Sequence, residues 1–208
     1  MSSVAASPID PAVRFLRTRP WARKSLSGLS ALLIAVAVGV LGYPVYTNLY
    51  QTRLQSQLDR EFASPALAVA YKERRVAVGD SLTRIKIPAI GVNVMVVEGT
   101  SASALRAGAG HYPETPLPCE LGNVAIAGHR TTYGRPFNQL DRVKIGDEVI
   151  LETPIGSCRY VVRAAPYVTE PTDLSVLDPT PTGTLTLTTC HPKGSARQRL
   201  ILKAELQA

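Results

Sequence analysis

Residues 184–190, with the sequence TLTLTTC, decide the fold of this 208-residue chain and locate its chemistry. Successive side chains of a β-strand point to opposite faces, so the two leucines enter a core while Cys190 lies on the other face with alternate threonines. The same alternation turns His129 away from the apolar residues before it, and Arg199 away from those after it. The sequence therefore predicts that a thiol, an imidazole and a guanidinium leave the core on the outward faces of three strands.

Short runs rich in Val, Ile and Thr, separated by Gly and Pro, continue along the chain from about Asp80. Many short strands without long alternating helices predict an all-β barrel or sandwich with a few short helices. The predicted strands are 82–87, 92–97, 124–129, 148–152, 160–168, 184–190 and 199–206, and the predicted helices are 102–107, 136–140 and 174–177.

An uncharged apolar run from about Leu26 to Val45 precedes this β-rich part. About twenty such residues span a bilayer as a helix. The competing interpretation is a signal peptide, but the run is long for one and is not followed by a clear Ala-x-Ala cleavage site. We therefore predict one N-terminal transmembrane anchor.

The charges around this run predict its orientation. Five basic residues precede it and are opposed only by Asp10, and basic flanks stay on the cytoplasmic side. We expect a cytoplasmic tail (1–25), an anchor (26–46), an extracellular stalk (47–78), helical until Ser64-Pro65 ends it, and an extracellular folded domain (79–208). The basic residues, Arg14, Arg17, Arg19, Arg23 and Lys24, account for more than half of the net charge of +7. No basic helix or aromatic-interleaved patch accompanies them, which excludes nucleic acid as a partner.

Three cysteines in an exported protein are one more than a disulfide needs. Cys119 and Cys158 each lie in a loop-like context just ahead of an apolar strand. They either pair outside the cell or remain two free thiols, and the sequence leaves both open. In either case Cys190 is the odd cysteine, where a reactive thiol is expected.

The residue types at the three outward positions suit acyl transfer. A cysteine thiolate is the nucleophile, and a neighbouring cation or base activates it. Histidine protonates a leaving amine near neutral pH, and arginine holds a developing oxyanion. Each residue also has an ordinary interpretation: a small buried thiol, a structural histidine, an arginine on a solvated edge. Their joint occurrence on outward faces favours a catalytic site formed by Cys190, His129 and Arg199.

These residues resemble a known family. The segment TLTTC at 186–190 is similar to the Thr-Leu-x-Thr-Cys signature of sortases, the membrane-anchored cysteine transpeptidases of Gram-positive bacteria. The resemblance runs from about Asp80 to the C-terminus and includes Gly128-His129-Arg130 after an apolar strand, and Arg199 before an apolar final strand. It implies a closed eight-stranded β-barrel with a groove on its outer surface.

The resemblance also implies roles and partners. Cys190 is then the nucleophile, His129 the general acid and base, and Arg199 the residue that holds the oxyanion or the substrate. The enzyme would cleave a C-terminal sorting signal between Thr and Gly through a thioacyl intermediate. It would then pass the protein to the amine of a peptidoglycan precursor of the lipid II type. Expected partners are therefore proteins with sorting signals, that precursor and the membrane.

Three further segments, 110–113 (GHYP), 129–134 (HRTTYG) and 190–192 (CHP), resemble class E sortases of actinobacteria. That class generally prefers Leu-Ala-x-Thr-Gly to Leu-Pro-x-Thr-Gly. Tyr112 is the candidate for reading the second position, since a phenol near the groove could bond a backbone N–H that proline lacks; a tyrosine that only packs on the barrel is the alternative. Thr189 is a second candidate substrate-binding residue, lining the groove or donating to the oxyanion.

Two rivals for the predicted roles are weaker. Arg197 does not directly precede the apolar strand as Arg199 does. His191 follows Cys190 directly and should therefore point to the other face of the strand. His111 has no assigned role.

Other functions remain open. A pilin-polymerising sortase is disfavoured by the short 47–78 segment, and a non-catalytic membrane-tethered peptide-binding barrel by the intact Cys, His and Arg set. L,D-transpeptidases carry a Ser-x-Gly-Cys type of signature that this chain lacks, and papain-like proteases place the cysteine before the histidine. We expect no cofactor and no metal. A zinc site from His111, Cys119, His129 and Cys190 matches no standard spacing, and no clustered acidic loop suggests calcium.

Overall fold

The computed structural model describes residues 15 and 18–207, and its contacts divide the chain into two compact units, Met1–Val45 and Tyr46–Ala208. Helix α2 (Pro20–Phe62) belongs partly to each unit. Pro44 lies inside this helix, next to the boundary between the units.

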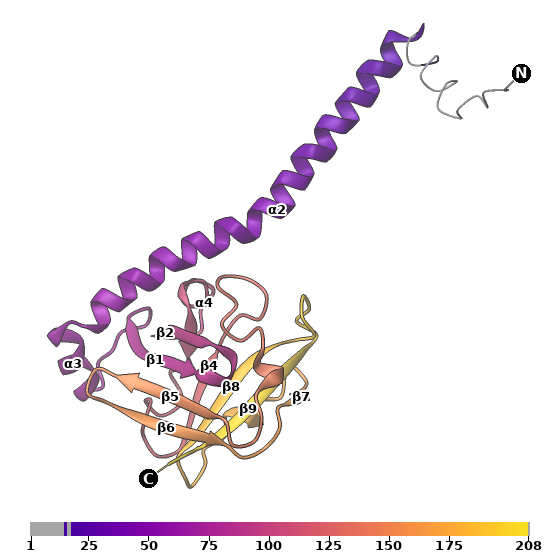
Figure 1. Ribbon diagram of the computed structural model, residues 1–208. Coiled ribbons are helices and arrows are strands. Elements are labelled where there is room, and N and C mark those ends of the chain that lie inside the picture. The colour runs from indigo at the N-terminus through magenta and orange to yellow at the C-terminus, as the bar shows by residue number, and fades with distance from the viewer. Residues whose placement is uncertain (1–14, 16–17, 208) are drawn as a thin grey trace, which may run out of the picture. The chain divides into compact units, whose positions relative to one another are not determined.

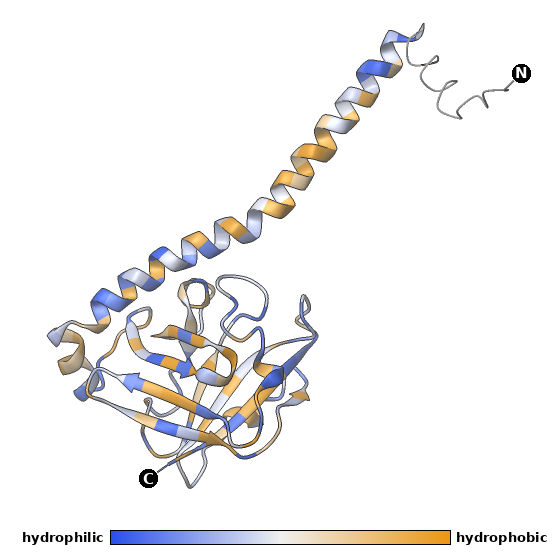
Figure 2. Cartoon of the chain, in the orientation of Figure 1, coloured by the Kyte–Doolittle hydropathy of each residue, from blue (hydrophilic) through white to orange (hydrophobic). Residues whose placement is uncertain are grey.

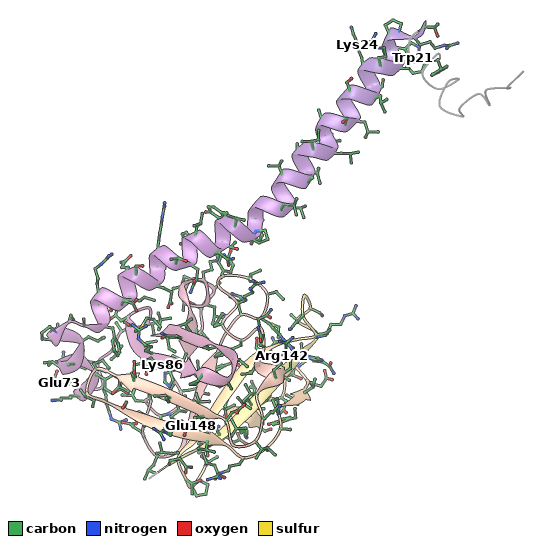
Figure 3. The ribbon with its side chains drawn as sticks, in the orientation of Figure 1. Trp21, Lys24, Glu73, Lys86, Arg142 and Glu148 are labelled. Carbon is green, nitrogen blue, oxygen red and sulfur yellow. A yellow bond between two sulfur atoms is a disulfide. The ribbon has the colours of Figure 1, made fainter. Side chains whose placement is uncertain are left out.

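In the first unit, α2 carries the apolar run that the sequence assigned to a membrane anchor, and Figure 2 shows apolar residues concentrated in this half of the helix. Within the described part of the chain, α2 is the one helix long and apolar enough to cross a membrane by length and composition. Trp21 and Lys24 lie at its N-terminal end (Figure 3). Arg14 and Arg17, two of the basic residues used to predict its orientation, lie outside the described residues.

The second unit is a closed β-barrel (Figure 1), as predicted. Its eight strands follow the order β6-β5-β1-β2-β3-β4-β8-β9, and pairing of β6 with β9 closes the ring. A ninth short strand, β7 (Tyr167–Thr169), pairs with the other part of β9. The barrel strands are β1 (Ser81–Ile87), β2 (Val92–Glu98), β3 (Ala109–His111), β4 (Asn123–Ala127), β5 (Glu148–Thr153), β6 (Gly156–Val162), β8 (Thr184–His191) and β9 (Gln198–Leu206).

Strand β8 lies between β4, to which it is parallel, and β9, to which it is antiparallel. All three send alternate apolar side chains into the barrel, because burying one face of each strand removes those side chains from water. Leu185 and Leu187 of β8 join the core there, with Val124 and Ile126 of β4 and Leu200, Leu202 and Ala204 of β9. The predicted inward faces of these strands are therefore confirmed, whereas His129 lies beyond the end of β4.

The polar part of α2 packs on the barrel wall. Leu58 is buried in a small cluster with Met95 and Val97 of β2. The Gln55 side chain both accepts from the Met95 N–H at 2.7 Å and donates to the Ala107 carbonyl at 2.7 Å. Asp59 forms an ion pair of 2.7 Å with Arg84 of β1. The segment expected to be a stalk is therefore helical until Phe62 and belongs to the same compact unit as the barrel.

Short helices complete this unit. The Ser64 side chain caps α3 (Pro65–Lys72) by accepting from the Leu67 N–H, so the Ser-Pro pair that ends α2 also begins a helix that was not predicted. Helices near the predicted positions are α4 (Ala102–Ala107) and the 3₁₀ turn η3 (Leu174–Leu177), and two further 3₁₀ turns are η1 (Pro88–Ile90) and η2 (Leu140–Arg142).

Several predicted boundaries are wrong. The single strand expected at 160–168 is two strands, β6 and β7, because Pro166 cannot donate to a ladder. Strand β4 ends at Ala127, before His129, and the helix expected at 136–140 is replaced by turns followed by η2. Strand β3 was missed because its three residues carry no β-branched side chain.

The structure shows whether Cys119 and Cys158 pair. Cys119 and Cys158 form a disulfide with a Cα–Cα distance of 5.5 Å, which ties the loop before β4 to β6. Cys190 is free and half-buried. Of the two alternatives that the sequence left open, the paired form is therefore the one observed.

Candidate active site

Strand register brings the three predicted residues to one level of the barrel wall. Cys190 pairs directly with Arg199 across β8 and β9. Ala127 of β4 pairs with Thr188, and His129 and Cys190 each lie two residues beyond this pair in parallel chain directions. A hydrogen bond from the Gly128 N–H to the Thr188 carbonyl, 3.0 Å, continues the pairing past the end of β4. The thiol, imidazole and guanidinium therefore come from neighbouring segments at the same end of the wall.

The outward face of these strands is closed at one end and open at the other. At the closed end Thr186 is fully buried and donates to Asn123, whose amide donates to the Val176 carbonyl of η3 at 2.9 Å. At the other end His129, Cys190 and Arg199 are all partly exposed. This face is therefore accessible from outside at the end that carries the three predicted side chains.

His129 is positioned by the loop that follows β4. Its carbonyl accepts from the Phe137 N–H, and its ring lies 5.5 Å from the Tyr133 ring, which Arg106 of α4 contacts from 5.9 Å. Burial lowers the pKa of His129, and the positive charge of Arg106 lowers it further, because both disfavour the imidazolium. The neutral imidazole is therefore the main form at neutral pH. The sequence analysis quoted Tyr133 only within the segment 129–134 and did not consider Arg106, since their contact joins the loop after β4 to helix α4.

Arg199 opens β9 opposite the thiol. Its guanidinium donates to the carbonyls of Ala196 at 3.0 Å and Gln198 at 3.2 Å, which hold it beside the β8–β9 loop. The rival Arg197 lies in that loop, exposed and outside the pairing of β8 with β9. The structure thus brings Arg199, and not Arg197, into register with Cys190.

Tyr112 follows β3 directly and reaches the same face. Its hydroxyl lies 3.2 Å from the Thr188 hydroxyl, one outward position before Cys190 on β8. The side chain is partly exposed. Tyr112 therefore reaches the outward face of β8 next to Thr188, and its role in substrate binding stays a prediction.

The structure puts Thr189 on the other face, against the expectation that it lines the groove. Its side chain is 3% exposed, and its hydroxyl donates to the Gly128 carbonyl at 2.7 Å. The reason is the strand alternation itself, because the residue next to an outward Cys190 must point inward. A side chain at Gly128 is excluded for a separate reason, since a Cβ there would lie 2.6 Å from the Phe137 ring.

Arg130 is a further residue of the site region, which the sequence analysis quoted within Gly128-His129-Arg130 but gave no role. Its guanidinium contacts the Cys190 carbonyl, the His191 ring and Asp141. A signal was available, since Arg130 follows His129 directly, but nothing in the sequence shows that its side chain is buried.

The remaining histidine, His111, lies elsewhere in the wall. It is fully buried, with Nδ1 2.9 Å from a Glu98 oxygen and Nε2 2.9 Å from the Pro116 carbonyl. The zinc site considered from sequence is contradicted, because Cys119 is disulfide-bonded and His111 already uses both nitrogens. No group of three or more potential His, Cys, Asp or Glu ligands occurs among the described residues.

Comparisons with known proteins agree with this geometry. A family model described as the Sortase domain matches residues 85–207. The chain is 34% identical over 139 residues to sortase SrtE1 of Streptomyces coelicolor, covering 60% of this chain and 40% of that protein. It spans 40–60% of the length of the curated relatives it matches.

Solved structures match over most of their own length. Sortase E from Streptomyces avermitilis superimposes with a TM-score of 0.58 at 40% identity, covering 64% of this chain and 91% of that one. A sortase D5 transpeptidase of Clostridium perfringens gives a TM-score of 0.66 at 29% identity, covering 76% and 98%.

Proposed function

Since this chain belongs to the sortase family, we propose that it is a cysteine transpeptidase that cleaves a C-terminal sorting signal between Thr and Gly. One observation carries the proposal. His129, Cys190 and Arg199 lie at one level of three adjacent segments, on the accessible end of an otherwise covered face. A thiol, a base and a fixed cation in that arrangement are what acyl transfer requires.

In the first half of the reaction the Cys190 sulfur attacks the carbonyl carbon of the threonine. The lowered pKa of His129 leaves its imidazole neutral, so it takes the thiol proton as the sulfur attacks. Arg199 then stabilises the negative oxygen of the tetrahedral intermediate, because its guanidinium is always charged. The C–N bond breaks, the leaving glycine amine takes the proton from His129, and a thioester on Cys190 remains.

In the second half an acceptor amine attacks the thioester carbonyl. His129 removes a proton from that amine, the C–S bond breaks, and the returning sulfur recovers the proton. The products are a new amide and the original thiol. We assign the acceptor to the amine of a peptidoglycan precursor of the lipid II type, because this is the usual second substrate of the family that the sequence resembles.

We further propose that the sorting signal is of the Leu-Ala-x-Thr-Gly type and that Tyr112 contributes to this preference. The proximity of its hydroxyl to Thr188, one outward position before Cys190, supports a contact with a residue ahead of the cleaved bond. A phenol oxygen can accept from a backbone N–H, and proline has none to offer.

The N-terminal part of α2 is proposed to anchor the enzyme in the cell membrane in a single pass. The apolar run supports this, and Arg19, Arg23 and Lys24 at its N-terminal end favour a cytoplasmic N-terminus. The barrel would then lie outside the cell. The observed disulfide is consistent with an oxidising compartment.

The test uses the full-length protein in detergent micelles with two quenched fluorescent peptides, one carrying Leu-Ala-x-Thr-Gly and one Leu-Pro-x-Thr-Gly. We expect cleavage between Thr and Gly, a thioester adduct on Cys190 by mass spectrometry, and a larger kcat/KM for the first peptide. The Cys190→Ala variant should form no adduct and cleave neither peptide. The Tyr112→Phe variant should bring the ratio of the two kcat/KM values closer to one.

Other outcomes would redirect the assignment. A folded wild-type protein that cleaves neither peptide, and whose Cys190 does not react with a thiol probe, would favour a non-catalytic peptide-binding barrel. Equal kcat/KM values for both peptides would leave the transpeptidase proposal intact and remove the role of Tyr112.

A further inference from the structure

Arg130 occupies an unusual environment for its residue type. Its side chain is 3% exposed, and within residues 15 and 18–207 it is the one arginine or lysine that is buried. Arginine is rarely buried completely, because removing a guanidinium from water is costly unless acceptors replace the lost hydration. The partners of Arg130 therefore indicate what its position achieves.

Those partners join the segment after β4 to the end of β8. One terminal nitrogen of the guanidinium contacts the Cys190 carbonyl at 3.3 Å and the His191 Nδ1 at 2.8 Å. The other forms an ion pair with Asp141 at 3.1 Å. Asp141 has a lowered pKa: partial burial opposes this shift, but a backbone hydrogen bond and the charge of Arg130 outweigh it.

The contact with Arg130 fixes the hydrogen-bonding role of one His191 ring nitrogen. A guanidinium only donates hydrogen bonds, so the His191 Nδ1 must accept. In the neutral ring the proton is then on Nε2. His191 is thereby held as a hydrogen-bond acceptor for Arg130, which agrees with its rejection as the base of the reaction.

Hydrogen bonds join the two segments on both sides of His129 and of Cys190, and Arg130 supplies those on one side. Before His129, Gly128 bonds β8 twice: its N–H donates to the Thr188 carbonyl at 3.0 Å and its carbonyl accepts from the Thr189 hydroxyl at 2.7 Å. After His129, Arg130 bonds residues 190 and 191 of the same strand. His129 and Cys190 thus each lie between neighbours that are tied to the opposite segment.

We propose that Arg130 is a positioning residue that sets the placement of the His129 imidazole relative to the Cys190 thiol. The proposal rests on the function proposed above, because it assumes proton transfer between these two groups. β4 ends at Ala127, so no strand pairing holds the segment beyond Gly128 against β8. The buried guanidinium supplies this connection at the point where the sheet hydrogen bonds stop.

The main test compares Arg130→Met with Arg135→Met in full-length protein in micelles. Methionine keeps a similar length but removes the donors and the charge, and Arg135 is an exposed arginine in the same loop. We expect Arg130→Met to lower kcat for peptide cleavage about 100-fold, since displacement of a reacting group by about 1 Å has an effect of this size. KM should change less than threefold, and Arg135→Met should match the wild type.

A double-mutant comparison separates positioning from general destabilisation. If Arg130 acts by placing His129, then adding Arg130→Met to His129→Ala should reduce the residual cleavage less than threefold. A merely structural role would lower activity by the same factor in both backgrounds, in proportion to the folded fraction measured by circular dichroism. Equal factors in both backgrounds would overturn the proposal.

If Arg130→Met does not fold, His191 provides the decisive variants. The Oδ1 atom of asparagine can occupy the position of the histidine Nδ1, so His191→Asn should keep kcat within about threefold, whereas His191→Leu should lower it about tenfold. Equal kcat values for these two variants would overturn the proposal. A wild-type protein that cleaves no sorting peptide would overturn the proposed function and this inference together, whereas an active wild type with an unaffected Arg130→Met overturns this inference alone.

Discussion

Two histidines of this barrel differ in how many hydrogen bonds their ring nitrogens make to the surrounding residues. In the His111 cluster, defined as His111, Glu98, Thr115 and Pro116, the ring is fully buried and bonded at both nitrogens. In the His129 cluster, defined as His129, Cys190 and Arg199, the imidazole is partly exposed. Its ring nitrogens make no hydrogen bond to any residue in the described part of the chain.

This difference has an energetic meaning. Buried polar groups are normally bonded, because an unpaired one costs the full desolvation penalty. A histidine bonded at both nitrogens has no ring nitrogen open to a substrate. A histidine with open nitrogens, on a segment that runs beside the strand with a free thiol, is available to exchange a proton. Hydrogen-bond saturation therefore places His111 in the framework and agrees with the catalytic role proposed for His129.

The largest expected effect is the loss of His129. We predict that His129→Gln lowers kcat about 100- to 10,000-fold, because it removes the acid and base of both half-reactions. The free energy of unfolding should change by less than about 1 kcal/mol, since the ring makes no hydrogen bond in the described structure. Peptide cleavage and urea denaturation measure the two quantities. A His129→Gln variant that keeps the wild-type kcat would show that the histidine with open nitrogens does not take part in the reaction.

The reverse pattern is expected at the other histidine. We predict that His111→Leu lowers the free energy of unfolding by about 3–5 kcal/mol, because the Glu98 carboxyl stays buried without its partner. The kcat per folded molecule should stay within about threefold of the wild type. The double variant His111→Leu/Glu98→Met should recover much of the lost stability, and a failure to recover it would argue against an unpaired carboxyl as the cause.

The disulfide belongs to the same part of the framework as the His111 cluster, since Cys119 lies in the loop that also carries Thr115 and Pro116. The bond closes a segment with a sequence separation of 39. Chain entropy then predicts that Cys119→Ala/Cys158→Ala lowers the free energy of unfolding by up to about 4 kcal/mol. Denaturation by urea measures this loss. Cleavage assayed where the variant is fully folded should be unchanged, and a large drop in kcat would connect this loop to the reaction.

The smallest effect concerns the charge beside His129. Removing the cation in Arg106→Gln should raise the pKa of His129 towards its ordinary value, leaving burial as the remaining cause of the shift. Histidine ¹H–¹⁵N NMR spectra recorded from pH 4 to 8 follow the titration. A His129 pKa equal in the variant and the wild type would show that Arg106 does not act on this ring.

The lowered pKa of His129 also makes the folded protein less stable as pH falls. The folded-state pKa of His129 lies below the unfolded value of about 6.5, so the unfolded chain binds the proton first as pH falls. The contribution of His129 to stability is therefore fully present above pH 6.5 and is lost as pH falls towards the folded pKa. His129→Gln should flatten the pH dependence of unfolding in this window.

Much of the fold was predictable because it depends on local alternation. The pattern of leucines and threonines in β8 placed Cys190 outward, and the same count placed Arg199 outward in β9. The all-β class followed from many such segments. Failures occurred where alternation carries no information: β3 is too short, and Pro166 interrupts a run that otherwise looks continuous.

The candidate site was predictable only in part, for a related reason. Cys190 and Arg199 were selected from strand faces and the family signature, and His129 was selected by the same count although it lies beyond the end of β4. Thr189 was expected near the substrate although its own alternation turns it inward, towards Gly128. Arg130 could not be assigned, because two of its three partners, Cys190 and His191, lie about sixty positions further along the chain.

The sequence by itself determined which side of each strand meets water, and which residue types stand on that side. Neighbours along the chain encode this property, because burial of every second side chain follows from the pleat. Only the tertiary structure decided that β4, β8 and β9 lie side by side, that Cys119 pairs with Cys158, and that Arg130 is buried behind Cys190. These contacts join residues far apart in the chain, so they depend on strand register and on the closure of the whole barrel.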